Sequence, residues 1–260
     1  MDLFSITEDQ LFNVCLFLLL ITGLFVFVLL FFVTAPYGRH TRKGWGPGIE
    51  NKTAWVIMEA FPPIVFVCYF FFGTWKTGLM PVVFIGLWMI HYLYRAFLFP
   101  FLLRGRKIMP LSILLFGIIF NTVNAYTQGR YLFFLSPGIQ KYSADWILTP
   151  QFITGAALFL TGFFLHVSSD SITRNLRRQG ETEYKIPFGG MYRWISCPNY
   201  LGEIIQWAGW ALLTWSIPGL LFAFWTAANL IPRAASNHKW YKKNFNDYPS
   251  ERKAVIPFIL

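Results

Sequence analysis

Long apolar runs, separated by short polar stretches, recur along the whole chain of 260 residues. Most of these runs are long enough to cross the hydrocarbon core of a bilayer as one α-helix. We expect seven membrane-spanning helices, near residues 11–33, 54–72, 80–99, 111–134, 152–167, 200–215 and 219–231. The last two runs are short and meet at Ser216-Ile-Pro-Gly219, which favours a tight helical hairpin. The alternative count is five or six spans, with one of the runs re-entrant.

The composition also indicates an all-α, polytopic membrane protein. Hydrophobic residues make up 55% of the chain and charged residues 13%, whereas a soluble domain carries about 25% charged residues. Because the apolar runs fill the whole length, we expect one integral domain, residues 1–260, and no soluble module. Residues 1–10 are acidic and lack the basic segment of a cleavable signal peptide, so the first run is expected to remain as an anchor.

The basic residues predict an orientation. If the N-terminus lies outside, alternate loops and the C-terminal tail hold 19 of the 22 Lys and Arg residues on the cytoplasmic side. These are Arg39, Arg42, Lys43, Lys52, Arg95, Arg104, Arg106, Lys107, Arg174, Arg177, Arg178, Lys185, Arg193, Arg233, Lys239, Lys242, Lys243, Arg252 and Lys253. Only Lys76, Arg130 and Lys141 are left outside, as the positive-inside rule requires.

Charge and cysteine content narrow the partners. The net charge of +10 lies in loops that flank the membrane, so anionic lipid headgroups or an anionic cytosolic ligand fit better than nucleic acid. Cys15, Cys68 and Cys197 are scattered, without CxxC or CxxH spacing. We therefore expect free thiols, no disulfide framework and no metal site.

Glu59 is the one acidic residue in the apolar run 54–72. Hydrocarbon or a protein cavity penalises the charged form of a carboxyl group there. Ionisable residues inside membrane segments commonly mark a pathway or a reaction site. The plainer interpretation is a carboxyl group that satisfies a buried Arg or a backbone group.

Five groups of polar residues follow helical spacing within or beside the apolar runs. They are Trp55 with Glu59; His91 and Tyr92 with Arg95; His166, Asp170, Arg174 and Arg177; Asn199, Glu203 and Gln206; and Arg233, Asn237 and Tyr241. Any one group could simply form interhelical hydrogen bonds that stabilise the helix bundle. All five lie toward the predicted cytoplasmic half, so together they predict a polar cavity that is open to the cytosol.

The residue types limit the kinds of reaction and ligand that such a cavity could support. The sequence has no Ser-His-Asp arrangement, no metal-ligand spacing and no GxGxxG turn between a strand and a helix. Several Arg residues with Asn, Asp and Tyr suit a phosphorylated cofactor, because guanidinium groups match phosphate geometry. A carboxyl group and a Tyr hydroxyl suit hydrogen bonding to a carbonyl in a dry site.

Two sequence blocks resemble a known family, the steroid 5α-reductases. They are YKIPFGGMYRWISCPNYLGEIIQW, residues 184–207, and DYPSERKAVIPFIL, residues 247–260. The similarity extends to YGRHT at 37–41, to Glu59, to His91-Tyr92 with Arg95, and to RGR at 104–106. The C-terminal block alone is less specific, because sterol reductases, enoyl-CoA reductases and isoprenylcysteine methyltransferases look similar there. Glu59 together with His91-Tyr92 is what favours the steroid 5α-reductases among these families.

The resemblance implies a seven-helix membrane enzyme that uses NADPH to reduce the C4–C5 double bond of 3-oxo-Δ4 steroids. Glu59 and Tyr92 would hold the 3-keto oxygen. Residues that match cofactor-binding positions are Trp55, Arg106, Asp170, Arg177, Tyr184, Asn199, Glu203, Arg233 and Tyr241. Three positions depart: Met58 stands where the family often has Gln, His166 replaces a cofactor-binding Asn, and Asn237 replaces a His.

The expected partners are a steroid that enters from the membrane, the bilayer and NADPH, and the expected state is a monomer in a bacterial inner membrane or the endoplasmic reticulum. The nearest alternative is a membrane reductase for an enoyl-CoA or another sterol double bond. A methyltransferase that uses S-adenosylmethionine, and a carrier or scaffold without catalysis, are the remaining alternatives.

Overall fold

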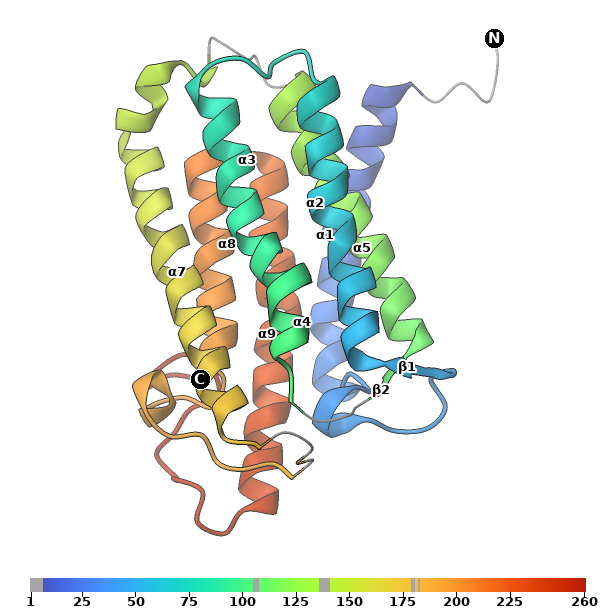
Figure 1. Ribbon diagram of the computed structural model, residues 1–260, viewed down its shortest axis with the longest axis vertical. Helices are drawn as coiled ribbons and strands as arrows, with labels where there is room; N and C mark the ends of the chain where they lie inside the picture. The colour runs from blue at the N-terminus through green and yellow to red at the C-terminus, as the bar shows by residue number, and fades with distance from the viewer. Residues whose placement is uncertain (1–6, 105–107, 136–140, 179–180, 182) are drawn as a thin grey trace.

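Seven long helices run side by side in the computed structural model, which describes residues 7–104, 108–135, 141–178, 181 and 183–260 (Figure 1). Their bounds are α1 Glu8–Phe32, α2 Asn51–Phe72, α3 Leu79–Tyr92, α5 Leu111–Arg130, α7 Pro150–Asn175, α8 Pro198–Thr214 and α9 Ile217–Asn244. Each apolar run identified in the sequence falls on one of these helices or on its direct continuation. The helical prediction is therefore confirmed.

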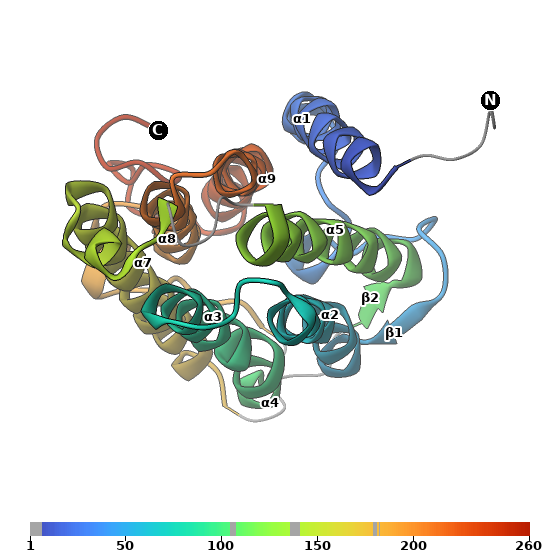
Figure 2. The same cartoon turned by 90° about the horizontal axis from the view of Figure 1, so that it is seen from above.

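Five of the described segments are long and apolar enough to cross a membrane. They are Glu8–Phe32, Asn51–Phe72, Leu79–Leu102, Leu111–Leu135 and Pro150–Asn175. Helix α8 has 17 residues, and α9 continues past the apolar run 219–231 into a segment with Arg233, Lys239 and Lys242. These two helices pack within the same bundle as the other five (Figure 2).

The two ends of the bundle differ. One end carries the two short strands and residues 183–197 and 245–260, and we call it the cap end; the first turn of α1 lies at the opposite end (Figure 1). At that opposite end, Arg130 at the end of α5 pairs with Glu8 of α1, with Nε and Oε1 3.0 Å apart. At the cap end, Lys253 of the tail pairs its backbone with Trp194 and Ser196, which joins the tail to the segment before α8.

The all-helical prediction missed one small sheet. Strands β1 (Gly48–Glu50) and β2 (Ile108–Pro110) pair antiparallel, with Gly48 opposite Pro110. Each strand leads directly into a helix, β1 into α2 and β2 into α5. The pairing therefore brings the first turns of α2 and α5 together, and it sets which residues of the two helices lie at the same depth.

The third apolar run is not one regular helix. After α3 the chain forms a π-helical turn, Leu93–Leu98, and then the short helix α4, Phe99–Leu102. Pro100 in α4 has no N–H to donate to the preceding turn, which is one reason for an irregular helix here. Such π turns are frequent at functional sites. This one carries Arg95.

Helices α7 and α8 meet along a seam of glycines. Gly155 and Gly162 of α7 lie against Gly209 and Gly202 of α8, and a Cβ atom on any of them would press into the backbone of the other helix. Small residues allow the backbones of membrane helices to approach closely. The seam therefore holds the polar residues at the cap end of α7 and α8 in direct contact.

The turn between α8 and α9 agrees with the hairpin expected from the sequence. Trp215 adopts a left-handed conformation with φ of 45°, and Ser216 accepts a hydrogen bond from the N–H of Gly219 at 3.1 Å. Beside this hairpin lies an aromatic core. Phe66 stacks on Trp88 with ring centres 4.5 Å apart, and Trp207 contacts Phe222 at 4.2 Å.

Candidate active site

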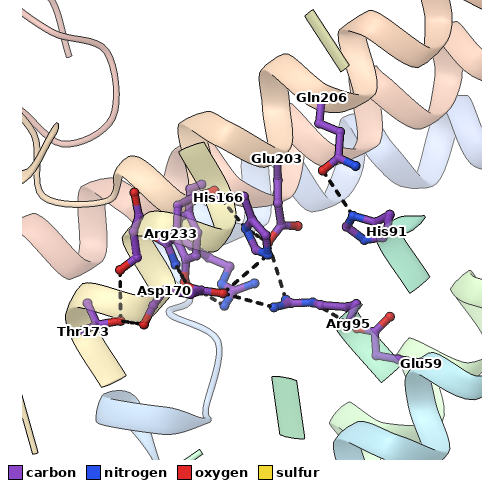
Figure 3. Close-up of polar contacts among 12 residues, drawn as sticks. Glu59, His91, Arg95, His166, Asp170, Thr173, Glu203, Gln206 and Arg233 are labelled. Atoms are coloured by element: carbon purple, nitrogen blue, oxygen red, sulfur yellow. Dashed lines mark hydrogen bonds and ion pairs between the residues drawn. The ribbon is translucent and has the colours of Figure 1, made fainter. Parts of the chain in front are cut away.

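Arg95 lies at the centre of a buried cluster of acidic side chains. Its guanidinium nitrogens are 3.7 Å from Glu59 Oε1, 3.5 Å from Glu203 Oε1 and 4.0 Å from Asp170 Oδ2. The four residues come from α2, the π turn, α7 and α8, and Figure 3 shows them converging. Each of the four side chains is at most 14% exposed. Buried charges persist only when paired, so this cluster fixes four segments relative to one another.

His166 connects two of these carboxylates. Its Nδ1 is 3.2 Å from Glu203 Oε1, and its Nε2 is 3.4 Å from Asp170 Oδ2. Asn199 donates from Nδ2 to the other Asp170 oxygen at 3.0 Å. One guanidinium and one imidazole thus face three carboxyl groups, and Asp170 Oδ2 makes no hydrogen bond within the described residues.

Aromatic rings enclose the Arg95 guanidinium. It lies 4.4 Å from the ring centre of Trp55 and 4.9 Å from that of Phe99. A guanidinium over an aromatic face is stabilised by the charge distribution of the ring. The predicted pairing of Trp55 and Glu59 on one face of α2 is therefore visible here, with Arg95 between them.

Tyr92 is the last residue of α3 and lies next to this cluster. Its side chain is 2% exposed, and its ring contacts Trp88 at 4.8 Å and His91 at 4.9 Å. Glu59 is an electrostatic neighbour of the Tyr92 hydroxyl. No hydrogen bond joins the two within the described residues, where Glu59 pairs with Arg95. That Glu59 and Tyr92 together bind a substrate carbonyl oxygen stays a prediction.

Two adjacent cavities open at the cap end. The larger has a volume of about 220 Å³, and its lining includes Arg39, Arg104, Arg174 and Arg177 with Asp170. The smaller has a volume of about 180 Å³. Arg39, Tyr200 and Asn237 line both, so they form the shared wall. Clustered guanidinium groups are typical of sites for phosphate or carboxylate.

The structure brings most of the sequence-predicted cofactor residues to this region. Asp170, Arg177, Asn199, Asn237 and Tyr241 line the larger cavity, and Tyr184, Arg233 and Asn237 line the smaller one. Trp55, His166 and Glu203 lie around Arg95 instead. Helix α7 ends at Asn175, so Arg177 reaches the cavity from the segment after the helix. Arg106 lies outside the described residues.

Arg39 was not among the predicted site residues, although YGRHT lies in a block with family resemblance. It donates from Nη2 to the Tyr241 hydroxyl at 3.2 Å, and its guanidinium lies 4.9 Å from the Tyr184 ring centre. Its Nη1 is buried and makes no hydrogen bond with the described residues. Next to it, His40 bonds Asn237, with Nε2 and Oδ1 3.1 Å apart, and burial lowers the pKa of His40.

Arg95 was among the polar residues expected to line the cavity, but its central position was not predicted, and three polar residues of α5 were missed. Asn121 donates to the Met58 carbonyl at 2.9 Å, beside Glu59. Asn121, Asn124 and Gln128 are buried on one face of α5, and their spacing of three and four residues inside an apolar run was a readable signal. Within the described residues, no group of three or more His, Cys, Asp or Glu residues could hold a metal ion.

Known proteins resemble this chain over nearly its whole length. A sequence model described as 3-oxo-5-alpha-steroid 4-dehydrogenase matches residues 107–260. The 3-oxo-5-alpha-steroid 4-dehydrogenase 1 of Bos taurus is 40% identical over 247 residues, which cover 92% of this chain and 93% of the relative. The steroid 5-alpha-reductase DET2 of Gossypium hirsutum is 38% identical over 260 residues, 97% of this chain and 99% of the relative. The human 3-oxo-5-alpha-steroid 4-dehydrogenase 1 is 36% identical over 258 residues, 98% of each chain.

The family match covers more than half of the chain, and these relatives match it almost from end to end. The chain therefore belongs to the steroid 5α-reductase family, and it is an oxidoreductase that acts on CH–CH groups.

Proposed function

We propose that this protein uses NADPH to reduce the C4–C5 double bond of 3-oxo-Δ4 steroids to 5α-steroids. One observation carries the proposal: the arginine-lined cavity at the cap end and the buried Glu59–Arg95 pair beside Tyr92 share Asp170. A site for an anionic cofactor is thereby connected to a pair of groups suited to a carbonyl oxygen. Membership of the steroid 5α-reductase family supports a steroid as the substrate.

The residues present fit a nicotinamide dinucleotide phosphate. Arg39 Nη1 is buried and makes no hydrogen bond within the described residues, and neither does Asp170 Oδ2, although His166 and Arg95 lie 3.4 and 4.0 Å from it. Phosphates and an amide would satisfy such atoms. The residues that would hold the cofactor are Trp55, Arg106, His166, Asp170, Arg177, Tyr184, Asn199, Glu203, Arg233, Asn237 and Tyr241.

In the proposed chemistry, bound NADPH supplies a hydride for C5, the β-carbon of the enone. Tyr92 donates a hydrogen bond to the 3-oxo oxygen, and Glu59 aligns and polarises Tyr92. These contacts stabilise the negative charge that develops on that oxygen as the β-carbon is reduced. Trp88 and Trp207 are buried around Tyr92 and exclude water from the reaction. A proton then adds at C4.

The proposed setting is one integral membrane domain over residues 1–260, acting as a monomer, with seven spans. The N-terminus would lie outside and the cap end in the cytosol, where NADPH is present. The distribution of Lys and Arg over the loops supports this orientation. The steroid would enter from the bilayer, since an apolar substrate partitions there.

A ligand screen on the purified protein separates this function from its alternatives. We expect NADPH to raise the melting temperature more than NADH, and S-adenosylmethionine to leave it unchanged. In turnover assays, testosterone or progesterone should drive NADPH oxidation and yield a 5α-reduced 3-ketone. Stabilisation by S-adenosylmethionine alone, or NADPH oxidation with an enoyl-CoA only, would exclude the proposed function.

Glu59→Gln tests the acidic half of the carbonyl site. The variant keeps the shape of the side chain, so the protein should fold and bind NADPH while turnover falls. A folded variant that reduces the steroid at the wild-type rate would make Glu59 a structural residue.

A further inference from the structure

A chain of buried amides on α5 leads to Tyr92, and the chemistry described above leaves it unused. Asn124 and Gln128 are each 1% exposed and lie one turn apart on the same face of the helix. Gln128 Nε2 donates to Asn124 Oδ1 at 3.3 Å. Buried side-chain amides carry a high desolvation cost, so each polar atom of such a chain needs a partner.

The orientation of the Gln128 amide is fixed by two neighbours that can act in only one way. The indole N–H of Trp210 can only donate, and it lies 3.0 Å from Gln128 Oε1. The carbonyl of Pro218 can only accept, and it lies 2.8 Å from Gln128 Nε2. A flipped amide would place donor against donor and acceptor against acceptor. Gln128 therefore has one stable orientation, with its second N–H directed at Asn124.

This order determines the orientation of Asn124. Its Oδ1 accepts from Gln128, so its NH₂ group faces the other way. That nitrogen is buried and makes no hydrogen bond within the described residues. Tyr92 packs in one buried cluster with Trp210 and with Ala125, the residue after Asn124, and the Asn124 side chain lies within reach of the Tyr92 hydroxyl. Trp210 thus donates to Gln128 and Gln128 donates to Asn124, and this chain of donors ends at the Asn124 nitrogen.

A Tyr hydroxyl has one hydrogen to donate and lone pairs to accept. If Tyr92 were free to rotate, it could give its hydrogen to any nearby acceptor. Asn124 presents its NH₂ group to Tyr92, and an NH₂ group only donates. Asn124 therefore cannot accept the hydroxyl hydrogen of Tyr92. A hydroxyl that accepts one hydrogen bond is also polarised into a stronger donor for the next.

We propose that Asn124 is a positioning residue for the reduction: its amide N–H, oriented through Gln128 and Trp210, donates to the Tyr92 oxygen and thereby directs the Tyr92 hydrogen to the 3-oxo oxygen of the substrate. This inference rests on the proposed function, because it assigns Tyr92 the carbonyl-binding role.

Asn124→Asp is the most informative variant. A carboxyl group has nearly the same shape, but in its ionised form it only accepts, so it should capture the Tyr92 hydrogen. Loss of one donor to an oxyanion typically costs about 10²–10³ in kcat, and we expect a fall in that range. The affinity for NADPH should stay within about two-fold, because a positioning defect at Tyr92 leaves the arginine-lined cavity intact.

A double-mutant cycle with Tyr92→Phe distinguishes positioning from packing. Once the Tyr92 hydroxyl is gone, Asn124→Asp should cost no further activity, because nothing is left to orient. Asn124→Leu, which removes the amide without adding a carboxyl group, should show the same coupling and serves if the Asp variant is unstable. Thr127→Val is the matched control: it changes a buried hydroxyl in the same turn and should keep the wild-type kcat.

The outcomes separate two failures. If Tyr92→Phe reduces the substrate at the wild-type rate, the carbonyl-binding role of Tyr92 fails and the inference fails with it. If Tyr92→Phe is slow but the Asn124 variants keep the wild-type kcat, or slow both backgrounds by the same factor, only the role of Asn124 is overturned. If the Asn124 variants slow the reaction only when the Tyr92 hydroxyl is present, and NADPH affinity is unchanged, the positioning role of Asn124 is supported.

Discussion

Arg95 and Glu203 form an ion pair of 3.5 Å across the boundary between the π turn of the third span and α8. The same guanidinium contacts Glu59 on one side and Asp170 on the other. Arg95 therefore links Glu59, which we propose acts at the substrate carbonyl, to Asp170 in the lining of the cap-end cavity. Replacing it should disturb both.

Arg95→Met would leave three buried carboxyl groups without their cation. Breaking a buried ion pair by removing one partner costs about 3–5 kcal/mol, so we expect a large loss of stability in thermal unfolding of the detergent-solubilised protein. Arg130→Met is the matched control, because Arg130 pairs with the half-exposed Glu8 and should contribute about 1 kcal/mol or less. Equal melting temperatures for the two variants would show that the Arg95 cluster is not a structural link.

Arg177→Ala should weaken NADPH binding. Arg177 lines the larger cavity, and its guanidinium lies 4.4 Å from the ring centre of Tyr184 in the smaller one. A phosphate site loses affinity when a charged donor is removed. We expect calorimetric titration to show a larger loss for NADPH than for NADH, because the arginine-lined cavity is the proposed site of the extra phosphate. Arg178→Ala, which removes an exposed neighbour absent from both cavities, is the control, and an equal effect of both variants would argue against the assignment.

Gly202→Ala tests the glycine seam between α7 and α8. A Cβ at this position would press against the backbone of His166, so the helices would have to separate. Overpacking of this kind typically costs about 1–3 kcal/mol. Gly86→Ala in α3 is the control, since a Cβ there meets no atom within 4 Å. We expect a lower melting temperature and weaker NADPH binding for Gly202→Ala alone; equal behaviour of the two variants would contradict close helix contact.

The stability of the cap end should depend on His238. Ser196 Oγ lies 2.6 Å from both His238 Nδ1 and the Tyr248 hydroxyl. Burial, with Lys242 and Lys253 nearby, lowers the pKa of His238 to about 4. The folded protein therefore binds this proton more weakly than the unfolded chain, where the pKa is about 6.5.

The sign of the effect follows from that difference. Stability from neutral His238 is complete above about pH 6.5 and is lost as the pH falls toward 4, because the unfolded chain then binds more protons. In His238→Asn, whose amide can hydrogen-bond Ser196 as donor or acceptor but does not titrate, the melting temperature should fall less over this pH range. A parallel decline in the wild type and the variant would show that other groups cause it.

The helices could be predicted from the sequence because apolar runs of this length have few alternatives to a helix. Most residues that line the cap-end cavities could be predicted because helical spacing and family resemblance point to the same positions, such as Asp170, Asn199 and Tyr241. The central position of Arg95 could not, since it depends on a π turn that shifts its direction relative to a regular helix. Arg39 lies in a loop whose path is set by contacts with Tyr241 and Tyr184.

The amide chain illustrates a different limit. Asn121, Asn124 and Gln128 share a face of an apolar helix, and this pattern is visible in the sequence. Its meaning is not, because the direction of the hydrogen bonds depends on Trp210 and Pro218, which lie about 80 or more positions further along the chain. Similarly, the glycines of α7 and α8 can be recognised as small residues, but only packing shows which of them meet.

The central claim is that hydride from NADPH reaches C5 of a 3-oxo-Δ4 steroid whose oxygen is held by Tyr92. A single-turnover reaction with NADPH deuterated at nicotinamide C4, on the face that transfers hydride, tests it most directly. We predict a 5α-reduced 3-ketone with deuterium at C5 and a solvent proton at C4, formed about 10²–10³ times more slowly by Tyr92→Phe. Deuterium at C3, or an unlabelled steroid after NADPH is consumed, would contradict the account.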